Sequence, residues 1–235
     1  MRNVAAQIVA GLYRTGAHPA GPPAGQPSVT RCALALAALL PALAAADQPL
    51  APIEGQIPQG DDFVTIPFEV PQGTAELHIV HTSLEPGATV DWGVESPSGF
   101  RGYGGGNREP VVIGARASSR SYRTGPLEPG TWRVYAGKAK SPSGTPGYRV
   151  EVTLRQSPTL PDEPHRAAWS PAPALSVGPR WYAGDFHTHS RESGDARATL
   201  DAMAAFAASR GLDFIELSEH NTNSHLELLS DAQSR

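Results

Sequence analysis

Residues 157–180 contain six prolines, and this stretch constrains the fold more than any other feature of the chain. Proline fixes one backbone dihedral and removes a hydrogen-bond donor, so neither a helix nor a central strand continues through so many of them. The hydrophobic residues in this stretch also follow no regular period. We therefore expect a semi-extended linker over 157–180 that separates two regions with different hydrophobic patterns.

The region before the linker is typical of an all-β domain. Its apolar residues alternate with polar ones, or are β-branched and aromatic, in short segments separated by Pro-Gly and Pro-x-Gly turns. The expected strands are 64–70, 75–81, 89–94, 110–114, 131–136 and 148–154. So many strands without a helical period predict a β-sandwich or jelly roll, which we place at residues 56–156.

Two features inside this domain have structural interpretations. The run Gly102-Tyr-Gly-Gly-Gly-Asn-Arg108 lacks the Gly-Lys-Ser/Thr ending of a phosphate-binding loop, and it predicts a conformationally demanding turn. His78 and His81 are three residues apart on an expected strand, so they face opposite sides of the sheet and are poorly placed to share a metal. We expect both histidines to be structural.

The first 46 residues have the features of a leader. Arg31 precedes an apolar run of about a dozen residues, which ends in Ala44-Ala-Ala46 before Asp47. This pattern predicts a secretory signal peptide cleaved after Ala46, preceded by a disordered, Gly/Pro/Ala-rich stretch. The apolar run is too short for a stable membrane anchor, so we expect a periplasmic or secreted protein with no anchor after cleavage.

Composition excludes several classes of function. The chain of 235 residues has a formal net charge of −4 and no cluster of Lys or Arg, so it lacks the basic surface that stable nucleic-acid binding needs. A single Cys excludes an internal disulfide and a thiolate metal cluster, so any metal site must use His, Asp and Glu. Nothing in the composition indicates an oligomeric state.

Residues 181–235 predict a strand, a helix and a second strand. The segment 181–190 is expected to be a buried strand ending in His187 and His189, and Thr199 is expected to cap a helix that ends at Gly211. The apolar stripe of that helix is Leu200, Met203, Phe206 and Ala207, and the next strand is 213–217. Such a crossover makes two parallel neighbouring strands.

Three histidines collect where these two strands end. His187 and His189 are two residues apart, so both imidazoles lie on one side of the first strand. His220 follows the second strand, and Asp195 lies in the loop after the first. The carboxyl ends of parallel strands meet at one edge, so these side chains predict a site for Zn²⁺, Mn²⁺ or Fe²⁺.

The same residues resemble a known family. The segment Phe186-His-Thr-His-Ser190 resembles the first motif of the PHP (polymerase and histidinol phosphatase) metallohydrolases, and Leu217-Ser-Glu-His-Asn221 resembles their second. The Gly-rich stretch from Ser96 and the segment Gly125-Pro-Leu-Glu-Pro-Gly-Thr-Trp132 are similar to the β-domain of secreted members of the CehA/McbA type.

The resemblance implies a distorted βα barrel that holds two or three divalent metal ions and hydrolyses phosphate esters, or other small molecules, with a metal-activated water. It implies that His187 and His189 bind one metal and that Asp195 and His220 serve another. The second motif of the family carries an Asp where this chain has the longer acid Glu219. We expect Glu219 to orient a metal ligand, a role that its extra length makes dependent on some rearrangement. Asp195 is also displaced by one residue from the acid of the family pattern.

The later motifs of the family are not found before Arg235. Residues 181–235 are far shorter than the roughly 200 or more residues of a βα barrel. We therefore expect 181–235 to be the N-terminal fragment of a PHP domain that is inactive as it stands, within a longer protein that is an enzyme.

Two other functions fit the sequence. Amidohydrolases and TatD-like nucleases also open with His-x-His at a first barrel strand, although a histidine at the second strand end, like His220, favours the PHP alternative. A non-catalytic secreted β-sandwich could instead bind a surface or polysaccharide by stacking Trp92, Tyr103 and Trp132 on sugar rings, although at strand spacing these residues are more typical of core or rim positions.

Overall fold

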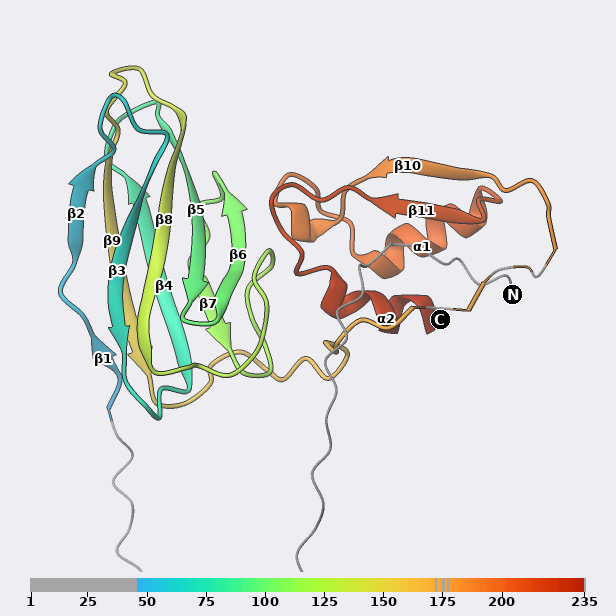
Figure 1. Ribbon diagram of the computed structural model, residues 1–235, viewed down its shortest axis with the longest axis horizontal. Coiled ribbons are helices and arrows are strands. Elements are labelled where there is room, and N and C mark those ends of the chain that lie inside the picture. Colours follow the sequence, from blue (N-terminus) through green and yellow to red (C-terminus); the bar gives the residue numbers. More distant parts are fainter. Residues whose placement is uncertain (1–45, 172, 175, 177, 235) are drawn as a thin grey trace, which may run out of the picture. The chain divides into compact units, whose positions relative to one another are not determined.

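The structure is a computed structural model that describes residues 46–171, 173, 174, 176 and 178–234. Figure 1 shows its elements in chain order. Before the Pro-rich linker these are β1 (Gln48–Pro49), β2 (Ile53–Gln56), β3 (Phe63–Val70), β4 (Glu76–Ser83), β5 (Thr89–Ser96), β6 (Gly99–Gly105), β7 (Val111–Gly114), β8 (Gly130–Lys140) and β9 (Gly147–Arg155).

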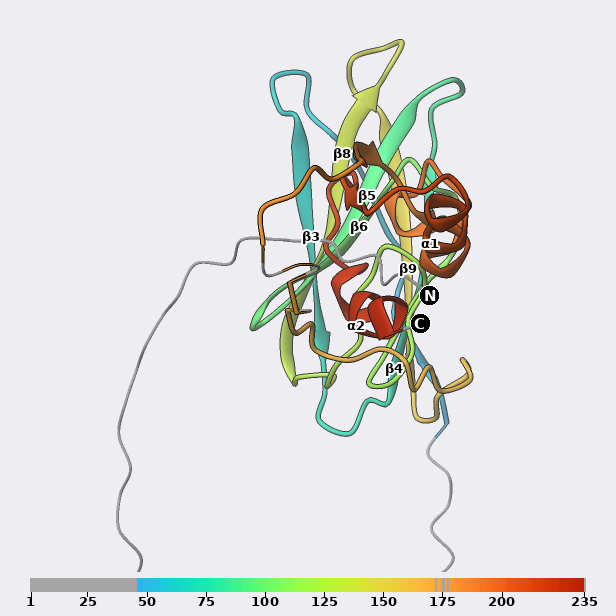
Figure 2. The same cartoon turned by 90° about the vertical axis from the view of Figure 1, so that its right-hand side faces the viewer.

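These nine strands form two antiparallel sheets, consistent with the predicted β-sandwich. One sheet has the order β1-β9-β4-β7, with β2 also pairing with β9. The other has the order β3-β8-β5-β6 and is seen in Figure 2. All six predicted strands are present, as β3, β4, β5, β7, β8 and β9. The short strands β1 and β2 were not predicted, and β1 precedes the predicted domain start at residue 56.

The alternation in each strand directs one set of side chains into a common core. In β4, Leu77, Ile79 and His81 are buried, whereas His78 is only partly buried on the other face. The ring of His81 stacks on Trp92 of the opposite sheet, with 4.6 Å between ring centroids. His78 and His81 therefore face opposite sides of β4, as predicted. The buried core includes Ile66, Phe68, Val90, Val94, Ile113, Trp132, Val134, Val152 and Leu154.

The Gly-rich run differs from the prediction. Gly102–Gly105 belong to strand β6, and the turn begins only at Gly106. Glycine is required at position 102 because its φ is +146° and a β-carbon there would lie 2.1 Å from the carbonyl oxygen of Ser121. The glycines of β6 therefore allow a second backbone segment to approach the strand, a role that a turn prediction does not include.

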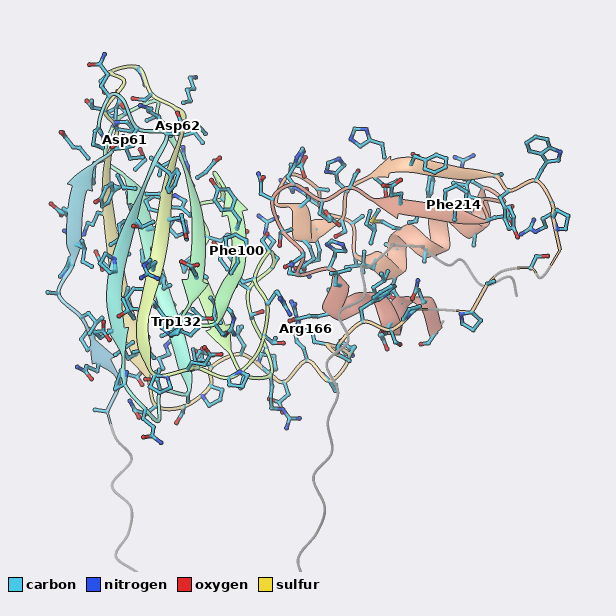
Figure 3. All side chains as sticks on the ribbon, in the orientation of Figure 1. Asp61, Asp62, Phe100, Trp132, Arg166 and Phe214 are labelled. Atoms are coloured by element: carbon cyan, nitrogen blue, oxygen red, sulfur yellow. The ribbon has the colours of Figure 1, made fainter. Side chains whose placement is uncertain are left out.

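Two of the three aromatic residues considered as sugar platforms lie in the core, as their strand spacing predicts. Trp132 has no exposed surface, and it lies inside the sandwich in Figure 3. Its indole N–H donates to the carbonyl of Glu128 at 2.8 Å. Trp92 is also buried in the core. Both residues pack between the sheets because strand alternation directs them inward, so neither can stack on an external ligand.

The Pro-rich segment has no helix or strand among its described residues. It is bonded to its surroundings nevertheless. The side chain of Arg166 is buried and forms ion pairs with Glu163 at 2.7 Å and with Glu227 at 3.4 Å. The main-chain N–H of Ala167 also donates to the carbonyl of Glu227 at 2.8 Å. This part of the chain therefore contacts the C-terminal helix instead of acting as a free spacer.

The predicted leader and signal peptide fall almost wholly on residues 1–45, outside the part that the structure describes. Within the described part, no helix combines the length and apolar character needed to cross a bilayer.

After the linker come β10 (Gly184–Thr188), a 3-10 helix (Arg191–Ser193), α1 (Leu200–Ser209), β11 (Phe214–Leu217) and α2 (Leu226–Ser234). The strands β10 and β11 are parallel, as the crossover predicts. Thr199 caps α1 by accepting a hydrogen bond from the N–H of Ala202, and Gly211 follows the helix with φ +73°. A complete βα barrel is not present within the described residues.

Helix α1 covers one face of the two strands (Figure 1). Leu200 and Ala207 of the predicted stripe are buried, but Phe206 is exposed, so its placement in the stripe was wrong. Position 206 lies at the edge of the apolar stripe, and the described elements that pack against α1 include β11 and α2. The phenyl ring of Phe186 in β10 is also largely exposed, at 70%.

Candidate metal centre

The parallel pairing of β10 and β11 places the two histidine motifs side by side. At the carboxyl ends of the strands, the N–H of Ser218 donates to the carbonyl of Thr188 at 2.8 Å. The register of the pair shifts between Asp185 and Thr188, which marks an irregularity in β10 just before the end of the strand. The residues that follow Thr188 and Ser218 therefore leave the sheet at one edge.

Three side chains at this edge could hold one metal ion. His189, Asp195 and His220 each offer a ligand atom, and these atoms lie within 4.8 Å of one another. Nδ1 of His189 is 3.6 Å from a carboxylate oxygen of Asp195, and Nε2 of His220 is 3.3 Å from the other oxygen. Ligands bound at about 2.1 Å to one tetrahedral ion lie about 3–4 Å apart, so only small side-chain movements separate this arrangement from a coordinated one.

Ser193 links the two histidine motifs. Its hydroxyl lies 3.1 Å from Nδ1 of His189 and accepts a hydrogen bond from the main-chain N–H of His220 at 3.0 Å. The side chain is buried at the end of the 3-10 helix, where Gly194 follows with a left-handed φ of +85°. That turn brings Asp195 back toward the histidines.

The electrostatics of the group favour a cation. A hydrogen bond from the Ser193 side chain lowers the pKa of the Asp195 carboxyl. Asp195 is therefore an anion at neutral pH. Its side chain is about half exposed, so solvent and a ligand can both reach it.

His187 and Glu219 lie beside the group but outside it. The His187 ring centroid is 5.1 Å from that of His189, and the side chain is exposed at the same edge. Both oxygens of Glu219 accept from the main-chain N–H of Ser190, at 3.0 and 3.1 Å. Burial raises the pKa of Glu219, and the nearby Glu192 carboxylate raises it further. Glu219 thus ties the end of β11 to the end of β10 instead of contacting a histidine ring nitrogen.

Neither Ser193 nor His225, a further histidine near the site loops, was identified from the sequence. Ser193 has a local signal in the sequence. It lies three residues after Ser190 and directly before Gly194, a spacing typical of a tight capped turn, and this turn follows the first histidine motif. His225 is buried in the loop before α2, and burial lowers its pKa to about 4. Its Nδ1 has no hydrogen-bond partner among the described residues. No alternation or spacing pattern distinguishes this histidine in the sequence.

Comparisons with known proteins add little to this geometry. No family model and no curated protein matches the chain. Among solved structures, a mitogen derived from Yersinia pseudotuberculosis is 20% identical over 49% of this chain and 92% of its own, with a TM-score of 0.30. A family two carbohydrate esterase from Cellvibrio japonicus is 14% identical, with a TM-score of 0.18, over 71% of this chain and 52% of its own.

Proposed function

We propose that this chain belongs to a secreted or periplasmic metal-dependent hydrolase of the PHP type that acts on phosphoesters. The observation that carries the proposal is the group of His189, Asp195 and His220, which two parallel strand ends bring within 4.8 Å. The secreted location rests on the signal-peptide pattern that ends at Ala46.

The three side chains fit a divalent transition metal. Two imidazoles and one carboxylate are the donor set that suits Zn²⁺, Mn²⁺ or Fe²⁺, and three protein ligands leave coordination positions open. When bound, such an ion would lower the pKa of a water molecule and polarise a phosphoryl oxygen. His187 is the nearest further imidazole at this edge, so it is the side chain we assign to a second ion of a two- or three-metal cluster.

The residues around the group have defined tasks in this proposal. Asp195 supplies the negative charge that offsets the cation. Ser193 fixes the ring of His189 relative to the main chain of His220, because its hydroxyl is hydrogen-bonded to both. Glu219 fixes the two strand ends together through Ser190, which keeps His189 and His220 at a constant separation. Orienting groups of this kind commonly change metal affinity or activity by about 10–100-fold when removed.

The amidohydrolase and TatD-like alternatives would use the same ion with a different substrate. His220 at the end of the second strand favours the PHP type over them. Hydrolysis of p-nitrophenyl phosphate and bis-p-nitrophenyl phosphate, compared with hydrolysis of an amide and a lactone, separates a phosphoesterase from an amidohydrolase, and cleavage of DNA identifies a TatD-like nuclease.

The experiment is a hydrolysis assay on the full-length enzyme loaded with Zn²⁺, Mn²⁺ or Fe²⁺, because residues 181–235 are expected to be inactive as they stand. We expect phosphoester hydrolysis that a chelator abolishes and that falls to background in the variant His189→Ala with His220→Ala. His165→Ala is the matched control, because His165 is an exposed histidine of the linker, and it should keep full activity. Equal hydrolysis by the double variant and the wild type would refute the proposal.

A second candidate function is glycan binding by the β-sandwich. Phe63 and Phe100 are exposed, and their rings lie 5.9 and 6.4 Å from that of Tyr135, forming one aromatic cluster on the β3-β8-β5-β6 sheet. The hydroxyl of Tyr135 donates to Glu95, so a carboxylate able to accept from sugar hydroxyls borders the rings. A glycan screen with wild type and with Phe63→Ala plus Phe100→Ala tests this function, and no binding by the wild type removes it.

A further inference from the structure

We propose that Ser121 and Glu192 are positioning residues, through which the β-sandwich orders the two loops that carry the candidate metal ligands. This inference rests on the proposed function, because it assigns these residues to the same metal site. Ser121 belongs to the loop between β7 and β8, and Glu192 belongs to the 3-10 helix between β10 and α1.

The N–H, hydroxyl and carbonyl of Ser121 all form hydrogen bonds with the two loops that carry the candidate metal ligands. Its N–H donates to a carboxylate oxygen of Glu192 at 2.9 Å, and its hydroxyl donates to the Glu192 carbonyl at 2.7 Å. Its own carbonyl accepts from the hydroxyl of Thr222 at 2.9 Å. Glu192 lies in the loop after β10, which bears Asp195, and Thr222 lies in the loop after β11, which bears His220. One sandwich residue thus contacts both loops.

Glu192 connects the two loops directly as well. The same carboxylate oxygen that accepts from Ser121 also accepts from the hydroxyl of Ser224, at 2.7 Å. Glu192 and Ser224 are both buried, so these hydrogen bonds are shielded from water. Ser193, the residue after Glu192, holds His189 and His220. Movement of Glu192 would therefore reach all three candidate ligands.

The backbone at Ser121 is held in an unusual conformation. Its φ is +70°, and its side chain has no exposed surface. A residue other than glycine adopts this left-handed conformation at a cost, and such strain is retained mostly where function requires it. A glycine at this position would adopt the same conformation without the hydroxyl that binds Glu192.

The Gly-rich strand β6 fixes Ser121 in place. The N–H of Tyr103 donates to the Ser121 carbonyl at 3.2 Å, and Gly102 leaves room for that carbonyl. At the other side of the contact, a β-carbon on Gly194 would lie 3.3 Å from the carbonyl oxygen of Gly104. Gly102 thus admits the carbonyl of Ser121, and the main chain of Gly104 lies against the loop of Asp195.

A matched pair of variants tests the positioning role. Ser121→Ala removes the hydroxyl that binds Glu192, whereas Thr124→Ala removes a hydroxyl that binds Glu227, away from the site loops but between the same two regions. Zn²⁺ affinity of the full chain is measured by calorimetry. We expect Ser121→Ala and Glu192→Ala to weaken it by about 10–100-fold. Thr124→Ala should stay within about twofold of the wild type.

Glu192→Gln supplies the rescue, because its amide oxygen can still accept from Ser121 and Ser224. It should recover most of the affinity that Glu192→Ala loses. Equal affinity of Ser121→Ala, Glu192→Ala and the wild type would overturn the positioning role and leave the proposed metal site intact.

Hydrogen exchange of residues 190–195 and 219–224 in the metal-free chain gives a readout that does not depend on the ion. Faster exchange there in Ser121→Ala than in Thr124→Ala supports the positioning role, and equal exchange contradicts it. If the wild type binds no Zn²⁺, the proposed function fails, while the exchange measurement still decides whether Ser121 orders the loops.

Discussion

The β-sandwich and the C-terminal segment are held together by different interactions. The sandwich buries a continuous set of aliphatic and aromatic side chains between two sheets. In residues 181–234, the buried hydrophobic side chains are Leu200, Ala207 and Leu229, and the buried polar ones include Ser190, Glu192, Ser193, Ser224, His225 and Glu227. The sandwich is thus stabilised by its own core, and the site-bearing segment by polar contacts with its neighbours.

The exposed side chains show the same contrast. Trp181 is 98% exposed, and Phe186 and Phe206 are also largely exposed. Among the described residues, helices cover only one face of the parallel strands β10 and β11, although parallel sheets are normally covered on both faces. Hydrogen bonds between Ser121 and Glu192 and between Thr124 and Glu227 connect this segment to the sandwich.

The largest expected effect separates a core tryptophan from an exposed one. Trp132→Ala should lower the free energy of unfolding by about 3–5 kcal/mol, because it leaves a cavity at the centre of the sandwich. Trp181→Ala should change the free energy of unfolding by no more than about 0.5 kcal/mol, because the ring of Trp181 is exposed and truncation removes no buried contact. Urea unfolding followed by circular dichroism measures both. Similar losses for the two variants would show that the sandwich core does not dominate stability.

A pH titration is expected to give the next largest effect. Burial lowers the pKa of His81 from 6.5 to about 4, so the folded sandwich keeps this ring neutral. Between pH 6.5 and pH 4, His81 is protonated in the unfolded chain but not in the folded chain. Its contribution to the free energy of unfolding is therefore complete above pH 6.5 and is lost as the pH falls toward 4. The shift corresponds to about 3 kcal/mol. We expect His81→Leu to remove that part of the loss in urea unfolding between pH 7 and pH 4.

His225 is a second buried histidine with a lowered pKa, and it lies in the C-terminal segment instead of the sandwich. Burial lowers its pKa to about 4 as well, so the C-terminal segment should lose stability in the same pH window. Hydrogen exchange distinguishes the two, because protonation of His81 should loosen β4 and β5, whereas protonation of His225 should loosen α2. Retention of the His81 effect in the His81→Leu variant would contradict this assignment.

The smallest expected effect is local to α1. Thr199→Ala removes the hydroxyl that accepts from the N–H of Ala202, which should destabilise the helix by about 1 kcal/mol. Hydrogen exchange in residues 200–209 should accelerate, and exchange in the sandwich strands should not change. Acceleration throughout the chain would mean that the two regions unfold as one unit.

The sequence predicts the sandwich well where side chains alternate. Strands such as β4 and β8 have clear inward and outward residues, and their alternation identifies Leu77, Ile79, Trp132 and Val134 as core. Strand β6 was missed because glycine carries no side chain to alternate. Its glycines serve the approach of Ser121, and a contact with a residue nearly twenty positions away leaves no local pattern.

The candidate site was predictable in part. Strand pairing and the crossover rule indicate that His189 and His220 share an edge, because parallel strands end together. The hydrogen bonds between Ser121 and Glu192 were not predictable, since they join residues 71 positions apart and leave no local pattern in the sequence. Ser193 lies between these cases, because its capped turn is local but its bond to His220 is not.

The central claim is that His189, Asp195 and His220 bind one divalent metal ion. Titration of the full chain with Co²⁺, followed by the visible absorption of the bound ion and by calorimetry, tests it most directly. We predict saturable binding in the wild type and in the His165→Ala control, and none at the same concentrations in His189→Ala with His220→Ala. Unchanged Co²⁺ binding by the double variant, or no binding by the wild type, would contradict the account.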